Sequence, residues 1–87
     1  MHIVYILKSH IDPSKTYTGI TTDLEKRLQE HNSDKSYYTK RYAPWYIETY
    51  ITFNNKNLAE TFEKYLKGGS GQAFMVKRLL PPTGEAK

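Results

Sequence analysis

Apolar residues fall into short segments along the chain, and their spacing predicts three strands. Residues 3–7 (IVYIL) form a continuous β-branched and aromatic run, which is typical of a strand covered on both faces. A turn-forming stretch at residues 9–14 separates this run from a second strand over 15–20, so the chain begins with an antiparallel hairpin. Gly19 lies where a side chain would limit a close approach between strands. The third strand is expected over residues 45–53, which are rich in Tyr, Ile and Thr.

The first predicted helix spans residues 23–31. Apolar or aromatic side chains at i, i+4 and i+7 form its inner stripe: Leu24, Leu28 and His31. Thr22, followed three positions later by Glu25, has the spacing of a capping box. Arg27 lies beside the stripe, so we expect Arg27 and His31 at the border between core and solvent.

Two further helices are predicted after the third strand. The helix over residues 56–67 would be capped by Asn55 or Asn57. The helix over residues 71–79 would begin after Ser70, which is a favourable cap.

The order of these elements predicts an α+β fold. It is a three-stranded antiparallel sheet flanked by helices, in the order ββαβαα. With 87 residues the chain has room for one domain, which we place at residues 1–80. We expect residues 81–87 to be a short, disordered polar tail.

Composition narrows the class of protein. Thirteen Lys and Arg against nine Asp and Glu give a net charge of +4, which favours a polyanionic partner only modestly. The chain has no cysteine, which excludes disulfides and thiolate metal sites. Its longest apolar run is too short to cross a bilayer, and no signal-peptide pattern precedes it, so we expect a soluble cytoplasmic protein without membrane contact.

Residues 32–42 lack an apolar period and are predicted to be a loop. Lys35, Lys40 and Arg41 alternate there with three aromatic residues: Tyr37, Tyr38 and Tyr42. Such alternation suits a phosphate backbone and unstacked bases, and Lys67 on a later helix would extend this nucleic-acid-binding face. A solvated loop whose tyrosines pack on the domain explains the pattern equally well.

The segments IVY at residues 3–5 and YTG at 17–19 resemble the paired motifs of the GIY-YIG endonucleases. Other features of that family follow in order along the chain: Arg27, His31, Glu63, and the flanking segments YTKR (38–41) and EKYLKGGSG (63–71). The resemblance covers residues 4–79 and is greatest to small stand-alone bacterial members.

Three positions depart from the family pattern. Ile3 replaces the usual glycine of the first motif, and Thr18 replaces the isoleucine of the second. Neither change removes a functional side chain. Ile20 stands where some excision-repair relatives carry a lysine, so chemistry here must proceed without it.

The resemblance implies a metal-dependent endonuclease that hydrolyses DNA phosphodiester bonds in repair or recombination. Glu63 would be the single protein ligand of Mg²⁺ or Mn²⁺, and Arg27 would hold a non-bridging oxygen of the scissile phosphate. Tyr17 would be the general base or its relay, and Tyr5 would position water or phosphate. His31 would accept or shuttle a proton.

Simpler structural roles remain open for the same residues. Glu63 would form a surface i,i+4 ion pair with Lys67, Arg27 would be solvated, and the strand tyrosines would pack. His31 would interact with the carboxyl end of its helix. At the level of function, the alternatives are a catalytically weak nucleic-acid-binding module and a module that docks on a protein partner supplying specificity. The oligomeric state is left open.

Overall fold

A computed structural model describes residues 1–33 and 37–81. Three strands form one antiparallel sheet in the order β2-β1-β3: β1 (His2–Ser9), β2 (Thr16–Thr21) and β3 (Trp45–Phe53). The helices of the described residues are α1 (Leu24–His31), α2 (Tyr37–Lys40), α3 (Lys56–Leu66) and α4 (Gly69–Arg78). The predicted α+β class and the order ββαβαα are confirmed, with the one-turn α2 as an addition.

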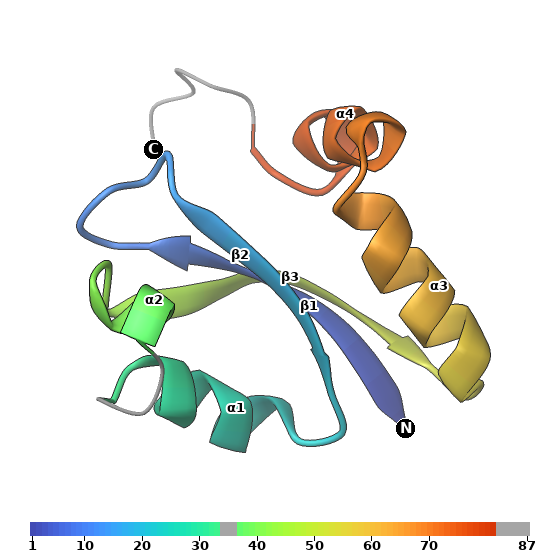
Figure 1. Cartoon of the computed structure of the whole chain (residues 1–87), viewed down its shortest axis with the longest axis horizontal. Coiled ribbons are helices and arrows are strands. Elements are labelled where there is room, and N and C mark those ends of the chain that lie inside the picture. The colour runs from blue at the N-terminus through green and yellow to red at the C-terminus, as the bar shows by residue number, and fades with distance from the viewer. Residues whose placement is uncertain (34–36, 82–87) are drawn as a thin grey trace.

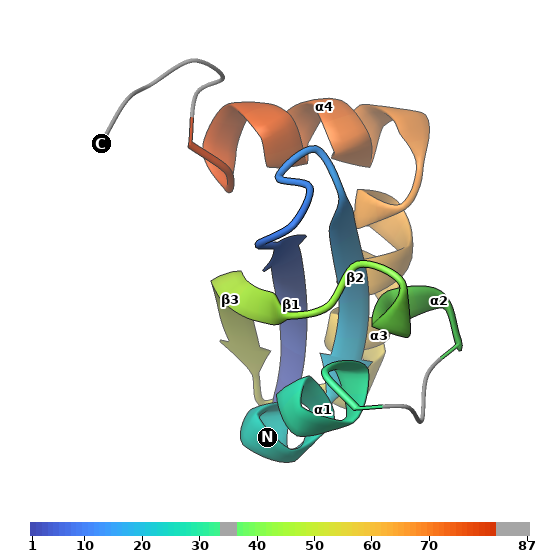
Figure 2. The same ribbon diagram turned by 90° about the vertical axis from the view of Figure 1, so that its left-hand side faces the viewer.

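β1 is the central strand and is buried on both faces, as its continuous apolar run predicted. Side chains alternate along it, so Val4 and Ile6 face one layer while Tyr5 and Leu7 face the other. Helices α1 and α2 lie on one side of the sheet and α3 and α4 on the other (Figure 1). The perpendicular view agrees, with α1 and α2 in front of the strands and α3 behind them (Figure 2). The sheet therefore separates two small cores.

Helix α1 begins one residue later than the capping-box spacing predicted. The Oγ1 atom of Thr21 accepts a hydrogen bond from the Asp23 N–H at 3.0 Å and donates to the Asp23 carbonyl at 3.2 Å. This tight turn brings the Asp23 carboxylate to the backbone N–H of Lys26, 3.1 Å away. Asp23 is thus the N-cap, and the assignment to Thr22 was wrong. A carboxylate also suits the positive end of the helix dipole.

Of the caps predicted for the two later helices, one is correct and one is wrong. Asn55 caps α3 by accepting the Leu58 N–H at 3.0 Å, which settles the choice between the two asparagines. Helix α4 begins at Gly69, two residues earlier than predicted, with Gly68 as its N-cap and no side-chain cap bond. Ser70 therefore lies inside the helix. Gly68, which takes the N-cap position instead, has no side chain to accept a backbone N–H.

The interval 32–42, predicted to be a loop, contains α2. Contacts to the start of β3 hold this segment in place. The indole Nε1 of Trp45 donates to the carbonyl oxygen of Thr39 at 2.6 Å. The Asn32 side chain accepts from the Trp45 N–H at 2.6 Å and donates to the Trp45 carbonyl at 3.1 Å. Because these contacts are tertiary, the local sequence pattern does not predict this helix.

Two expectations from the sequence fall outside the described residues. These are the candidate DNA contact Lys35 and nearly all of the polar tail, residues 82–87. Within the ranges that the structure describes, no helix has the length and apolar character needed to cross a bilayer.

Helix α4 packs closely against the end of α3, and this packing yields a test of the fold. A Cβ atom added at Gly71 would overlap the carbonyl oxygen of Tyr65, whereas one added at Gly69 would meet nothing within 4 Å. We expect Gly71→Ala to lower the free energy of unfolding by about 1–3 kcal/mol, because backbone must move to relieve the overlap. Gly69→Ala should change it by less than about 0.5 kcal/mol. Urea unfolding measures both, and equal stabilities would contradict this packing.

Candidate active site

The ring of Tyr5 lies over Gly19 on the neighbouring strand. The two residues are cross-strand partners, and Tyr5 is 1% exposed. A Cβ atom at position 19 would lie 2.6 Å from Cζ of Tyr5 and nearer still to its hydroxyl oxygen. The glycine is therefore required by the ring that crosses it, as the sequence predicted. The missing side chain lets the Tyr5 hydroxyl reach beyond β2 toward α1.

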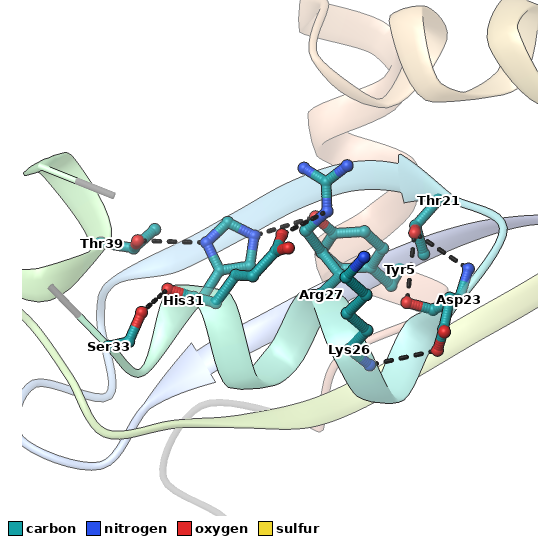
Figure 3. Close-up of polar contacts among 9 residues, drawn as sticks. Tyr5, Thr21, Asp23, Lys26, Arg27, His31, Ser33 and Thr39 are labelled. Atoms are coloured by element: carbon teal, nitrogen blue, oxygen red, sulfur yellow. Dashed lines mark hydrogen bonds and ion pairs between the residues drawn. The ribbon is translucent and has the colours of Figure 1, made fainter. Parts of the chain in front are cut away.

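A buried chain of hydrogen bonds begins at that hydroxyl. Tyr5 Oη lies 2.9 Å from Nε2 of His31, and Nδ1 of the same imidazole lies 3.1 Å from Oγ1 of Thr39. Figure 3 shows His31 between these two partners, so the chain links β1, α1 and α2. His31 is only 4% exposed, which corrects the expectation that it lies at the solvent border. Partners on both ring nitrogens lower the cost of burying it.

Tyr17, like Tyr5, packs its ring against His31. Its ring centroid lies 4.6 Å from that of His31 and 6.4 Å from that of Tyr5. Tyr17 is half-buried, so its ring packs on the buried imidazole and is also partly open to solvent. Thr18, which departs from the family motif, points to the opposite face, where its hydroxyl contacts the Met75 sulfur at 3.9 Å. The substitution therefore lies away from the site.

Arg27 supplies a positive charge at the edge of this group. It lies one helical turn before His31 on α1 (Figure 3). Its side chain is 43% exposed. Its Nε atom lies 3.5 Å from Oε1 of Glu30, in a pair that is exposed on both sides. Such pairs contribute little to stability. The expected position of Arg27 between core and solvent is confirmed.

Burial determines the protonation states of His31 and Tyr5 in this chain of hydrogen bonds. It lowers the pKa of His31 below its ordinary value, and the nearby Arg27 guanidinium lowers it further, against a smaller opposing effect of Glu30. Burial also raises the pKa of the Tyr5 phenol, which Arg27 partly opposes. Near pH 7 the imidazole is therefore neutral and the Tyr5 hydroxyl keeps its proton. A neutral imidazole can donate through one nitrogen and accept through the other, which matches its two partners.

Glu63 approaches from the other layer of the molecule, on α3. Its Oε2 lies 2.5 Å from Nζ of Lys67, with the glutamate side chain 13% exposed and the lysine 52%. The i,i+4 ion pair between Glu63 and Lys67, which the sequence offered as the simpler role of Glu63, is therefore present. Glu63 is also close enough to Tyr5 for its negative charge to help raise the pKa of that phenol. Its carboxylate therefore lies within electrostatic reach of the buried chain.

The donor set for a metal ion is sparse. Among residues 1–33 and 37–81 there is no cluster of three or more His, Cys, Asp or Glu side chains that could hold one. A hard divalent cation that keeps most of its water needs only one or two carboxylates. Glu63 offers one such carboxylate, and its Oε2 is already paired with Lys67.

The candidate DNA contacts Lys40 and Arg41 are both exposed and directly follow Thr39. Segment 37–42 therefore has its cations on the surface and its threonine hydroxyl on His31.

Thr39 is the residue of this site that sequence analysis missed. It is 0% exposed, and both its hydroxyl and its carbonyl are used, by His31 and Trp45 respectively. The only signal was its position within the segment YTKR. A threonine in a polar stretch looks like surface until its tertiary partner is known.

Comparison with known proteins supplies relatives for the whole site. The GIY-YIG catalytic domain matches residues 1–76. A UPF0213 protein of Lactococcus lactis subsp. cremoris is 42% identical over 67 residues, which make up 76% of this chain and 66% of the relative. A UPF0213 protein of Clostridium perfringens is 38% identical over 68 residues, 77% of this chain and 71% of the relative.

A more distant similarity is to a much longer protein. The structure-specific endonuclease subunit SLX1 of Malassezia globosa is 33% identical over 67 residues, 72% of this chain but 15% of that protein. The chain spans 66% and 62% of the length of the two Lactococcus relatives that it matches.

The lowered pKa of His31 predicts how stability depends on pH. As pH falls below about 6.5, the unfolded chain binds a proton at this histidine before the folded chain does. The free energy of unfolding should therefore decrease between pH 7.5 and 5.5, and His31→Gln should flatten this slope. His10→Gln, at an exposed position, should leave it in place. An NMR titration that puts the His31 pKa at or above 6.5 would contradict the prediction.

The Thr39 hydroxyl predicts a difference between two conservative variants. Thr39→Val keeps the shape but leaves Nδ1 of His31 without a partner, which should cost about 1–3 kcal/mol. Thr39→Ser keeps the hydroxyl and loses one methyl group, about 0.8 kcal/mol. Thermal and urea unfolding compare them. A valine variant as stable as the serine variant would mean that the hydroxyl does not support the imidazole.

Proposed function

Because the chain belongs to the GIY-YIG catalytic-domain family, we propose that it is a metal-dependent endonuclease that hydrolyses DNA phosphodiester bonds. The observation that carries this proposal is the buried hydrogen-bond chain Tyr5–His31–Thr39. Beside it lie Tyr17, whose ring packs on His31, and the partly exposed Arg27. A neutral imidazole beside a half-exposed tyrosine and an exposed guanidinium provides a proton acceptor and a phosphate ligand on one face.

Each residue then has a separate task. The Arg27 guanidinium binds a non-bridging oxygen of the scissile phosphate with its permanent charge. Tyr17, the more accessible tyrosine, meets the attacking water and acts as base or relay. Neutral His31 packs on the Tyr17 ring and would accept or shuttle a proton through the groups bonded to its two nitrogens, Tyr5 and Thr39. Tyr5 is fully buried, so we assign it to orienting His31 through the 2.9 Å contact. This narrows the expected role of Tyr5, which was to position water or phosphate.

Glu63 would hold Mg²⁺ or Mn²⁺ as its single protein ligand. When bound, the metal would act as a Lewis acid that stabilises negative charge on the phosphoryl oxygens. The half-buried carboxylate and its contact with the Lys67 ammonium support a cation at this position. Lys67 would then be available for DNA, together with Lys35, Lys40 and Arg41.

The substrate and partner are proposed from the named relatives. SLX1 is a structure-specific endonuclease subunit, so we propose branched DNA as substrate and a protein partner that supplies specificity. Such an activity belongs to repair or recombination. A chain without cysteine suits a reducing compartment, and we propose the cytoplasm.

A matched pair of variants on α3 tests the nuclease. Glu63→Gln should reduce Mn²⁺-dependent nicking of plasmid and forked DNA by about 10²-fold or more, because the metal loses its protein ligand. Glu60→Gln removes the same charge from an exposed pair with Lys56 and should cut like the wild type. Both variants should show unchanged thermal unfolding. If Glu63→Gln cuts normally, the metal assignment fails.

The same assay decides between the two candidate functions. A wild-type protein that binds DNA but cuts none of the substrates with Mg²⁺ or Mn²⁺ would replace the nuclease proposal with a non-cleaving nucleic-acid-binding module.

A further inference from the structure

Two cationic side chains from distant parts of the chain meet over one ring. The Lys15 ammonium lies 5.5 Å from the ring centroid of Tyr42, and the Arg41 guanidinium carbon lies 5.4 Å from it. Lys15 comes from the β1–β2 hairpin and Arg41 from the segment after α2. Both distances are within the range of cation–π attraction. Tyr42 thus has two positive charges within cation–π distance of its ring.

Tyr42 is itself firmly placed. Its carbonyl oxygen accepts a 2.6 Å hydrogen bond from the buried Ser9 hydroxyl, and its ring packs edge-on against Trp45 with centroids 6.4 Å apart. The ring also belongs to the apolar cluster that contains Tyr5 and Leu7. The support for the two cations is therefore part of the core on the active-site face.

Neither cation forms an ion pair with a carboxylate of the described residues. The ion pairs found within residues 1–33 and 37–81 use other cations, namely Arg27, Lys56 and Lys67. Hydrogen bonds from Ser14 lower the pKa of the Asp12 carboxylate, and the charge of Lys15 lowers it further. Asp12 therefore balances part of the lysine charge without forming an ion pair with it. Two positive charges beside one ring favour an anionic partner.

The position of the pair relates it to the proposed chemistry. Lys15 stands two residues before Tyr17, and Arg41 two residues after Thr39. Tyr17 packs on His31 and Thr39 hydrogen-bonds to it, so both cations belong to segments that contact the same imidazole. A strand whose phosphate lies at Arg27 would pass near them.

We propose that Lys15 and Arg41, held over Tyr42, form a contact for the phosphodiester backbone of the DNA strand that enters the active site. This deepens the proposed function and rests on it for the identity of the polyanion. The cations occupy the ring, so it supports them and does not stack on a base. The sequence pattern suggested Arg41, whereas Lys15 enters only through the fold.

Salt-dependent binding without catalysis tests the proposal. Binding of a fluorescent forked DNA is measured by anisotropy in EDTA across a salt series, for the wild type and for Lys15→Met, Arg41→Met and Lys56→Met. Each variant that loses a phosphate contact should reduce the slope of log K against log salt by about 0.9 for a duplex contact, or about 0.7 for a single strand. Lys56→Met removes one charge on α3 and should keep the wild-type slope.

The outcomes separate this proposal from the nuclease proposal. Slopes for Lys15→Met and Arg41→Met that match Lys56→Met would overturn the contact, because net charge alone would then govern binding. If the slopes fall as expected while the wild type cuts no substrate, the contact stands and the nuclease proposal fails. Unchanged slopes in a protein that does cut DNA overturn only the contact. Circular dichroism should show that all three variants are folded.

Discussion

The Tyr5 hydroxyl, which crosses Gly19 to reach His31, is the contact on which the rest of the site depends. It joins the central strand to α1 at 2.9 Å, and the second imidazole nitrogen extends the connection to Thr39 on α2. All three polar groups are almost completely buried. In such surroundings an unpaired polar group is costly, so each member of the chain holds the next in place. A site assembled in this way has its histidine oriented before any substrate arrives.

The pleat of the sheet explains how the motif can vary without loss of this arrangement. In β2 the side chains alternate, so Tyr17 and Gly19 face the active-site layer while Thr18 faces α3 and α4. The middle position of the YTG motif therefore has to satisfy only packing, and a threonine does so beside Met75. Gly19 has no such latitude, because the Tyr5 ring occupies the space of its side chain. The alternation of side chains along β2 thus explains why position 18 can be substituted and position 19 cannot.

The local sequence pattern predicted those features of the structure that depend on residues close together in the sequence. The strands, the helix order and the position of Arg27 between core and solvent all follow from spacing within one segment. The burial of His31 did not follow, because its partners Tyr5 and Thr39 lie on other elements. Helix α2 was missed for the same reason, since contacts with Trp45 hold it. The cap at Asp23 was missed because the Thr21 hydroxyl shifts the turn by one residue.

Electrostatics connects the two layers that the sheet keeps apart. Tyr5 and His31 belong to the α1 layer and Glu63 to the α3 layer, yet Glu63 and Arg27 both affect the pKa of Tyr5, in opposite directions. A cation at Glu63 would weaken the first effect, and a phosphate at Arg27 would weaken the second. A divalent ion held by Glu63 would share this carboxylate with Lys67, and the repulsion between the two cations would disfavour binding while no phosphate is present. A substrate phosphate offers both the metal and Lys67 a negative partner. Metal and DNA should therefore bind more favourably together than separately.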